Sequence, residues 1–364
     1  MNHKLRTFLV FAFILKCLAS SGQIAPPEPD SLKYKAYLGG YPIIFYLPET
    51  SWSFGAGGVF NFYTTQSENL NPSQILVGGA YTLKKQILSY ASYKLFFRDN
   101  DINIFGEVGY YEYFYPYFGI GDMTDAANEE SYSADYPRFQ VHYLQRVYKK
   151  FAIGGLYHFD NYRITEIAED GLIARNQPTG FSGSIISKVG LLMRYDNRDK
   201  VFYPSNGTFA TLQLTQNITG LGATESFTSF DFDVSTYKSL KKGILVFNFW
   251  SGRSFGDIPF QELFQLGGGR KARGIIKGRF RDKSIALIQS EYRFDIWKRF
   301  AGAVFGSYGA TSDSLSQILS SDWKFNYGAG LRFFLDKVNR TALRLDFAFG
   351  SDDFNFYFTV GEAF

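Results

Sequence analysis

The chemically richest part of this sequence is a glycine-rich segment with many basic side chains. It reads GGGRKARGIIKGRFRDKS, and its cations are Arg270, Lys271, Arg273, Lys277, Arg279 and Arg281. The next expected strand, ALIQSEYRF, places Glu291 on the same face as Gln289 and Arg293. An arginine beside such a carboxylate can form a bidentate, charge-assisted ion pair. Two interpretations compete: a solvated basic surface loop, or a loop that folds inward and pairs with Glu291.

Catalytic chemistry has few candidates, because the sequence has three histidines and His3 belongs to an expected leader. His142 and His158 lie on neighbouring expected strands, where either could serve as the base of a serine-type lipase on a barrel wall. Serine and asparagine are too frequent to identify a nucleophile or an orienting group, so an ordinary structural role is favoured. Two histidines without clustered carboxylates also make a weak metal site. We expect no catalytic residue, no metal and no cofactor.

Residues 1–22 have the layout of a secretory signal peptide, with a basic start, an apolar run and then small residues. Cleavage is expected after Ser21 or Gly22, followed by a short unstructured lead over residues 23–40. The only cysteine, Cys17, would leave with the leader. The mature chain would then have neither a disulfide framework nor a cysteine metal site.

The composition favours β-structure. Aromatic residues make up 19% of the 364 residues, with 39 Phe and 26 Tyr, and there are 36 Gly. Strands favour aromatic residues, tight turns favour Gly, and outer-membrane barrels gather aromatics at the lipid interfaces. A soluble sandwich or propeller shares this composition. The chain has 38 Lys and Arg against 34 Asp and Glu, and three of the basic residues lie in the expected leader. The mature chain would be almost neutral, so no nucleic-acid partner is expected.

No apolar stretch after the leader approaches the roughly 20 residues of a membrane helix. Instead, runs of about ten residues alternate between apolar and polar side chains, as the strands of membrane barrels do. In residues 325–335, Leu331 and Phe333 fall on one face and Arg332 on the other. Because lipid satisfies no backbone polar group, such strands must close into a barrel.

The expected fold is therefore an all-β, transmembrane, antiparallel β-barrel over residues 41–364, with about sixteen strands. The expected strands are 41–46, 52–63, 75–82, 86–96, 102–113, 136–147, 151–165, 183–195, 207–217, 226–238, 243–254, 284–294, 300–310, 325–335, 341–350 and 355–364. Short connections, expected to be periplasmic turns, alternate with long ones, expected to be outer loops. The short ones include 148–150, 239–242, 295–299 and 336–340, and the long ones include 114–135, 166–182, 255–283 and 311–324.

The basic loop, the SEYRF segment after it and GAGLR at 328–332 resemble the bacterial surface antigen barrels of the Omp-eighty-five superfamily. These are the barrels of outer-membrane assembly and translocation factors. Further stretches resemble the family in the same order: YPIIFYLPETSWSFG at 41–55, YFGIGD at 117–122, YDNRDKVFYPSNGT at 195–208 and GEAF at 361–364.

The resemblance implies roles for particular residues. Arg273 and Gly274 would be the signature of the sixth outer loop, which tucks into the lumen. Their lumen partners would be Glu291, Ser307 and Arg332, and Phe364 would be a C-terminal assembly signal.

The sequence departs from the family pattern in several places. Ala272 and Ile275 flank the Arg-Gly pair where the family more often has Val and an aromatic residue. In FGSYG at 305–309, Ser307 stands where the family carries an acidic residue. We therefore expect Arg273 to be held by one carboxylate, Glu291, and less firmly than in the family. The family's periplasmic docking domains and the patatin-like lipase domain of some relatives are also expected to be absent.

The resemblance implies a non-enzymatic outer-membrane protein that inserts, assembles or translocates proteins, or supports a machine that does so. Its partners would be outer-membrane lipid and periplasmic or outer-membrane assembly proteins, and its clients stay open. A passive channel is an alternative, and predicts conductance that rises when Arg273 or Glu291 is replaced. A structural subunit predicts stable co-purification without conductance. A lipid-modifying enzyme predicts an activity that is lost on replacing His142 or His158. Fold resemblance alone does not decide among them.

Overall fold

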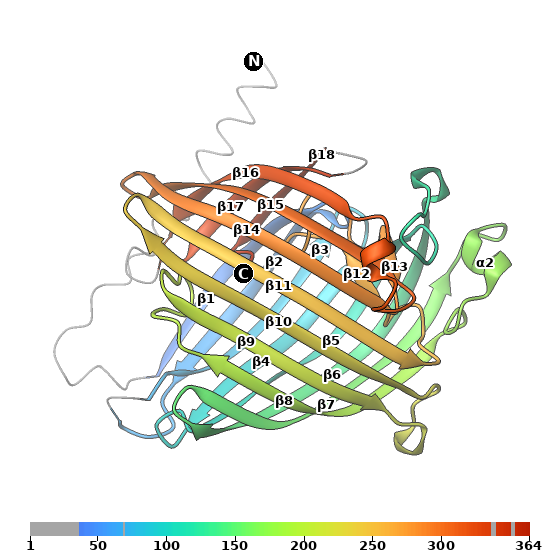
Figure 1. The fold of residues 1–364 in the computed structure, drawn as a ribbon. Helices are drawn as coiled ribbons and strands as arrows, with labels where there is room; N and C mark the ends of the chain where they lie inside the picture. The colour runs from blue at the N-terminus through green and yellow to red at the C-terminus, as the bar shows by residue number, and fades with distance from the viewer. Residues whose placement is uncertain (1–35, 68–69, 336–339, 351–353) are drawn as a thin grey trace, which may run out of the picture.

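The computed structural model describes residues 36–67, 70–335, 340–350 and 354–364, so the expected leader and Cys17 lie outside the described residues. Its antiparallel strands close into one barrel with strongly tilted strands (Figure 1). The order around the barrel is β1-β18-β17-β16-β15-β14-β11-β10-β9-β8-β7-β6-β5-β4-β3-β2. This confirms the predicted all-β antiparallel barrel of sixteen strands.

The barrel strands are β1 (Tyr37–Leu47), β2 (Ser51–Phe62), β3 (Ser73–Thr82), β4 (Ile87–Phe97), β5 (Ile102–Tyr117), β6 (Glu130–Tyr148), β7 (Phe151–Glu166), β8 (Ser184–Asp196), β9 (Gly207–Asn217), β10 (Phe227–Leu240), β11 (Gly243–Gly256), β14 (Ser284–Trp297), β15 (Phe300–Ser312), β16 (Lys324–Phe334), β17 (Ala342–Phe349) and β18 (Phe354–Val360). A separate two-stranded sheet consists of β12 (Phe264–Leu266) and β13 (Phe280–Asp282). The helical elements of the described part of the chain are the five-residue α2 (Leu172–Asn176) and three 3-10 turns, η1 (Ala126–Asn128), η2 (Thr219–Leu221) and η3 (Ile318–Ser320). Within the described ranges, no helix is long and apolar enough to cross a membrane.

Burial along β16 and β17 shows why the chain closes around a polar lumen. Arg332 on β16 is fully buried, whereas its neighbour Leu331 is 50% exposed. On β17, Asp346 is fully buried and Phe347 is exposed. Charged side chains inside and apolar side chains outside reverse the usual pattern of a water-soluble protein. A wall that faces lipid requires this arrangement, so the predicted alternation is confirmed on these strands.

The two longest predicted loops each contain several residues in strands. The connection expected at 114–135 is shorter, because β5 continues to Tyr117 and β6 begins at Glu130. Because proline is disfavoured inside a sheet, this extension of β5 was not predicted. Pro116 nevertheless lies within the ladder, opposite Ser131. The connection expected at 255–283 holds the small β12–β13 sheet, whose three-residue strands are too short to show an alternating pattern.

The C-terminal end of the last strand was also predicted too long. β18 ends at Val360, and Gly361 then adopts a left-handed φ of 83°, which turns the chain away from the sheet. Glu362 next forms ion pairs with the buried Arg332 and Arg293. A carboxylate with these partners belongs in the lumen and cannot continue a lipid-facing strand.

The junction of the first and last strands is the weakest ladder of the barrel. β1 is longer than the predicted 41–46, and it pairs with β2 along its whole length. Among the described residues, it is in register with β18 at one pair, Tyr46 opposite Phe358. The Tyr46 ring stacks on Phe356 with ring centroids 3.8 Å apart. Pro42, in the middle of β1, has no N–H to offer a neighbouring strand, as is usual for an edge strand. This junction is called the seam below.

Candidate functional site

A long loop between β11 and β14, residues 257–283, crosses the interior of the barrel and is called the lumen loop below. At one side, its Glu262 accepts a hydrogen bond from Lys188 Nζ on β8 at 2.5 Å. At the other side, its Arg273 lies 2.6 Å from Asp346 on β17. β8 and β17 are nearly half the circumference apart in the strand order. The loop therefore spans the lumen and is attached to opposite walls.

Arg273 of the lumen loop binds two carboxylates of the barrel wall. Its Nη2 lies 2.6 Å from Glu291 Oε2 on β14, and its Nη1 lies 2.6 Å from Asp346 Oδ2. The guanidinium also lies over the Phe305 ring, 3.5 Å from the ring centroid. Only 2% of Arg273 is exposed. The planar fork of the guanidinium suits two carboxylates and a ring face at once, which a lysine ammonium cannot match.

The two carboxylates that hold Arg273 also bind arginines of the barrel wall. Arg332 Nη1 lies 2.5 Å from Asp346 Oδ1, and Arg293 Nε lies 2.6 Å from Glu291 Oε1. All of these groups are almost completely buried. Buried carboxylates are costly unless they are paired and hydrogen-bonded, and here each one has at least two cationic partners. The lumen loop is thus fixed to a network and not to an isolated pair.

Gly274 positions Arg273 by allowing the loop backbone to touch the last strands. Its φ is 109°, and a Cβ atom at this position would lie 2.8 Å from the Phe349 carbonyl carbon. Its N–H donates to the Tyr357 hydroxyl at 3.0 Å, and its carbonyl accepts from Asn355 Nδ2 at 2.9 Å. Tyr357 and Asn355 both belong to β18. Only glycine meets both the conformational and the steric requirement here.

Ala272, the residue before Arg273, has a left-handed φ of 53° although it is not glycine. It is fully buried, and its N–H donates to Gln289 Oε1 on β14 at 3.1 Å. Next to it, Lys271 Nζ lies 2.5 Å from Asp233 Oδ2 on β10. A strained backbone persists only where its surroundings fix it from several sides, and the neighbours of Arg273 do so.

A second set of contacts ties the lumen loop to the connection between β5 and β6. Gly121 in that connection donates its N–H to the Arg281 carbonyl at 2.8 Å. Arg281 Nη2 in turn donates to the Pro116 carbonyl at 2.8 Å. Thr124 Oγ1 accepts from Arg279 Nη1 at 2.6 Å. The YFGIGD stretch singled out in the sequence is thus an anchor of the lumen loop.

Arg273 has a second acidic partner, Asp346, so the expectation of a single carboxylate is wrong. Ser307 instead accepts a hydrogen bond from Asn326 Nδ2 at 3.0 Å. Asp346 lies opposite Gly330 of β16, where a Cβ would come within 2.0 Å of the Asp346 carboxylate. Two features of the sequence could have indicated Asp346 as a partner of Arg273: the polar face of β17 and the glycines of GAGLR. Their meaning depends on the β16–β17 register, which the sequence does not provide.

Phe364, expected as an assembly signal, lies inside the barrel. Its backbone oxygen accepts a hydrogen bond from Arg293 Nη2 at 2.8 Å, and its ring lies 5.8 Å from the Arg273 guanidinium. The ring also packs against a cluster that includes Tyr203, Ala301 and Phe334. In the closed barrel, this aromatic residue therefore contributes to packing.

The contacts of the two histidines fit a structural role. The His142 ring stacks on Phe105 with centroids 4.6 Å apart and planes 2° apart. His158 Nε2 lies 2.9 Å from Asp160 Oδ2, a carboxylate that also binds Arg138. Across the described ranges, neither imidazole is hydrogen-bonded to a serine or threonine hydroxyl, and no group of three metal-ligating side chains occurs.

The electrostatics of Glu262 strengthen the attachment at β8. Burial alone would raise the pKa of this carboxyl group. The Lys188 ammonium, with a smaller contribution from His158, outweighs burial and the opposing charge of Asp160, so the pKa lies below its ordinary value of 4.5. Glu262 is therefore ionised near neutral pH and acts as an anionic anchor.

Comparisons with known proteins give a consistent picture. Residues 50–364 match the family model of the Omp85 superfamily domain. No curated protein matches the sequence. The solved structure of BamA from Haemophilus ducreyi lacking POTRA domains 1–3 is similar with a TM-score of 0.60 at 13% identity, over 90% of this chain and 70% of that one.

Two further structures are similar in fold. CdiB from Escherichia coli has a TM-score of 0.61 at 12% identity, over 93% of this chain and 63% of the other. CdiB from Acinetobacter baumannii has a TM-score of 0.55 at 11% identity, over 90% and 65%. This chain thus spans less than two thirds of either CdiB chain. At these identities the likeness is one of fold.

Proposed function

The chain belongs to the Omp85 superfamily, and we propose that it is a non-enzymatic outer-membrane barrel that inserts, assembles or translocates proteins, or supports a machine that does. The superfamily supports a place in the outer membrane. The lipid-facing aromatic surface and the polar lumen fit that place. The partners we propose are outer-membrane lipid and periplasmic or outer-membrane assembly proteins.

The single observation that carries this proposal is the seam. Every other neighbouring pair of barrel strands is in register over at least seven residues, whereas the described parts of β1 and β18 share the pair Tyr46–Phe358. Edge strands with unpaired backbone groups are templates for another strand. A barrel that opens here would offer β1 and β18 to a client chain and give it a lateral route into the bilayer.

Contacts between β18 and the lumen loop link the seam to the lumen. Tyr357 and Asn355 of β18 hold Gly274, next to the arginine that fixes the loop to β14 and β17. Movement of β18 away from β1 would therefore disturb the anchor of the lumen loop. We propose that seam opening and displacement of the lumen loop occur together.

A disulfide across the seam tests this function. Tyr46→Cys with Phe358→Cys places two thiols opposite each other across β1 and β18. The matched control is Leu345→Cys with Phe358→Cys, which joins β17 to β18 and leaves the seam free. Both pairs would be produced in the native host, and the outer-membrane and secreted proteomes compared with and without a reductant.

We expect the oxidised seam disulfide to deplete outer-membrane or secreted proteins, with recovery on reduction, while the control disulfide has no effect. Equal proteomes with the seam locked and unlocked would contradict the proposal. A passive channel is the second candidate, and the lumen loop that crosses the bore argues against it. Steady conductance of the unmodified barrel in planar bilayers would favour the channel.

A further inference from the structure

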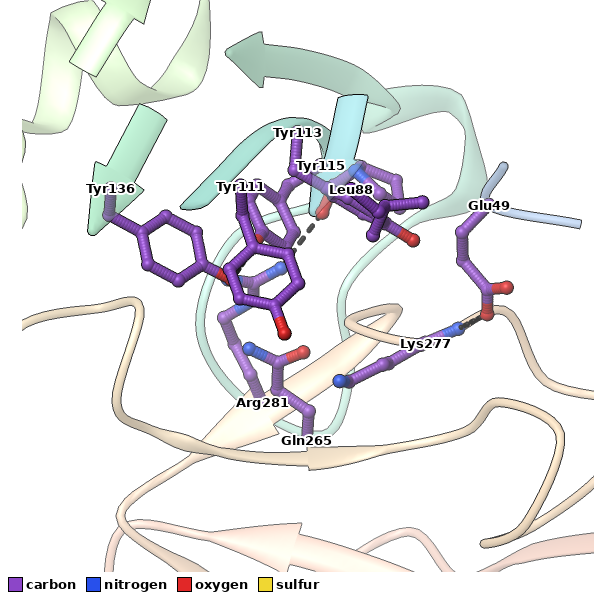
Figure 2. A pocket seen from close by; sticks show the side chains of 10 residues that line it. Glu49, Leu88, Tyr111, Tyr113, Tyr115, Tyr136, Gln265, Lys277 and Arg281 are labelled. Carbon is purple, nitrogen blue, oxygen red and sulfur yellow. Dashed lines mark hydrogen bonds between the residues drawn. The ribbon is translucent and has the colours of Figure 1, made fainter. Parts of the chain in front are cut away.

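A cavity of about 180 Å³ lies between the lumen loop and the lumen faces of β5 and β6 (Figure 2). Its wall on the barrel side is built largely from tyrosines at alternate positions of β5, such as Tyr113, together with Tyr136 of β6. The opposite side consists of Gln265, Lys277 and Arg281 from the lumen loop. The cavity is therefore enclosed by aromatic rings on one side and by polar and cationic groups on the other.

Three hydrogen-bond donors that line this cavity are unused. Lys277 Nζ, the Gln265 amide and the Tyr113 hydroxyl have no hydrogen-bond partner within the part of the chain that the structure describes. The Lys277 side chain is open to the lumen and extends from beside Glu49 toward the tyrosine wall (Figure 2).

The charge around the cavity is not balanced. The Arg281 guanidinium is 1% exposed, and its hydrogen bonds go to the backbone carbonyls of Gly278, Pro116 and Phe260. Across the described ranges, it forms no ion pair with a carboxylate. Glu49 is the one acidic side chain among the described residues that line the cavity, and its carboxylate accepts a hydrogen bond from the Lys277 backbone N–H at 2.7 Å. A cationic excess in a confined space attracts an anion.

We propose that this cavity binds a small hydroxylated anion that carries a carboxylate or a phosphate group. The anionic oxygens would accept hydrogen bonds from Lys277 Nζ and the Gln265 amide, and the charge of Arg281 would support them. Glu49 and Tyr113 would bind the hydroxyl groups. The cavity has the volume of roughly six water molecules, which suits a molecule of the size of citrate or glycerol 3-phosphate.

The test measures binding of citrate, glycerol 3-phosphate and uncharged glycerol to the purified full chain in detergent, by calorimetry. We expect saturable binding of citrate, of glycerol 3-phosphate or of both, and none of glycerol. The anion that binds more tightly shows whether the cavity prefers a carboxylate or a phosphate group. Lys277→Met should weaken binding by roughly tenfold or more, because a charge-assisted hydrogen bond is lost.

Lys283→Met is the matched control, since it removes one positive charge from the same loop at an exposed site that pairs with Asp313. Binding to this variant should equal that of the unmodified protein. Tyr113→Phe, which keeps the ring, should weaken binding by roughly threefold. Folding of each variant is checked by the heat-dependent shift in gel mobility that folded barrels show. The proposal is overturned if neither anion binds saturably, or if Lys277→Met and Lys283→Met bind equally well.

Discussion

Arg273 and Asp346 are 73 residues apart in the sequence, and their side chains meet at 2.6 Å inside the barrel. This contact joins the middle of the lumen loop to β17, the strand beside the last one. Because Arg273 also binds Glu291 on β14, one guanidinium connects two strands that are separated by β15 and β16. The position of the lumen loop therefore depends on correct closure of this whole quarter of the barrel.

Replacing Asp346 with Asn should destabilise the barrel strongly. The change keeps the shape but removes the carboxylate shared by Arg273 and Arg332, which leaves cations buried with too little negative charge. We expect a loss of roughly 3–5 kcal/mol in the free energy of unfolding. Urea unfolding in detergent, followed by gel mobility, measures it.

Ser307→Ala is the control for that change, because Ser307 occupies the position where an acidic partner was expected. It loses one neutral hydrogen bond, from Asn326, which amounts to roughly 1 kcal/mol. Equal effects of the two substitutions would show that Asp346 has no special role in the network.

Gly274→Ala should loosen the lumen loop. The new Cβ would adopt an unfavourable backbone conformation and would meet the backbone of Phe349 and Gly350. We expect higher ion conductance in planar bilayers, because the loop can no longer seat against β17 and β18. Gly222→Ala is the matched control, since its φ is 91° but nothing lies within 4 Å of the added atom. It should cost roughly 1 kcal/mol of backbone strain without a change in conductance.

Acidification should release the lumen loop at its β8 end. The pKa of Glu262 is lowered in the folded state, so the stabilisation by Lys188 is present above pH 4.5 and is lost as the pH falls through the lowered value. Conductance should therefore rise below pH 4.5. Glu262→Gln should show the raised conductance already at pH 7, with a weaker pH response. Glu169→Gln, at an exposed position in the β7–β8 loop, should behave like the unmodified barrel.

Phe364→Ala should lower the stability of the folded barrel, and not its assembly alone. The ring packs against the cluster around Tyr203, so its loss should cost roughly 1–3 kcal/mol, less than for a fully buried phenylalanine. Refolding from urea into detergent, without any other protein, measures this. Phe354→Ala, at an exposed position on β18, serves as the control. If Phe364→Ala leaves the stability unchanged, the ring does not stabilise the folded barrel, and Phe364 acts only as a signal recognised during assembly.

Periodicity in the sequence predicted the class of fold and the number of strands, because alternation is a local property of each strand. Leu331 and Arg332 illustrate it, since their exposure follows directly from the pleat. The end of β18 was missed because Gly361 and Glu362 leave the sheet for contacts with distant arginines. Similarly, proline locally disfavours a strand at residue 116, but the pairing of β5 with β6 keeps Pro116 inside the ladder.

The sequence predicted contacts of the candidate site only between segments that are close together in the chain. Arg273 and Glu291 are close in the chain, and the structure places them 2.6 Å apart. Asp346 was missed because its approach requires the strand register that sets it opposite Gly330. The anchor on Lys188 comes from a strand on the other side of the barrel, and the anchor on Glu49 comes from the β1–β2 turn, 228 residues before its partner Lys277. No local pattern in the sequence reveals such pairs.

The attachment of Gly274 to Tyr357 also constrains the order in which the chain folds. These residues are 83 apart in the sequence, and the neighbouring contact of Lys277 with Glu49 spans 228. The lumen loop cannot reach its final place until both the first hairpin and the last strand are present. Contacts of such long range form late and slowly. Closure of the cylinder and seating of its internal loop are therefore one event at the end of folding, and an unfinished barrel has an open, hydrated bore.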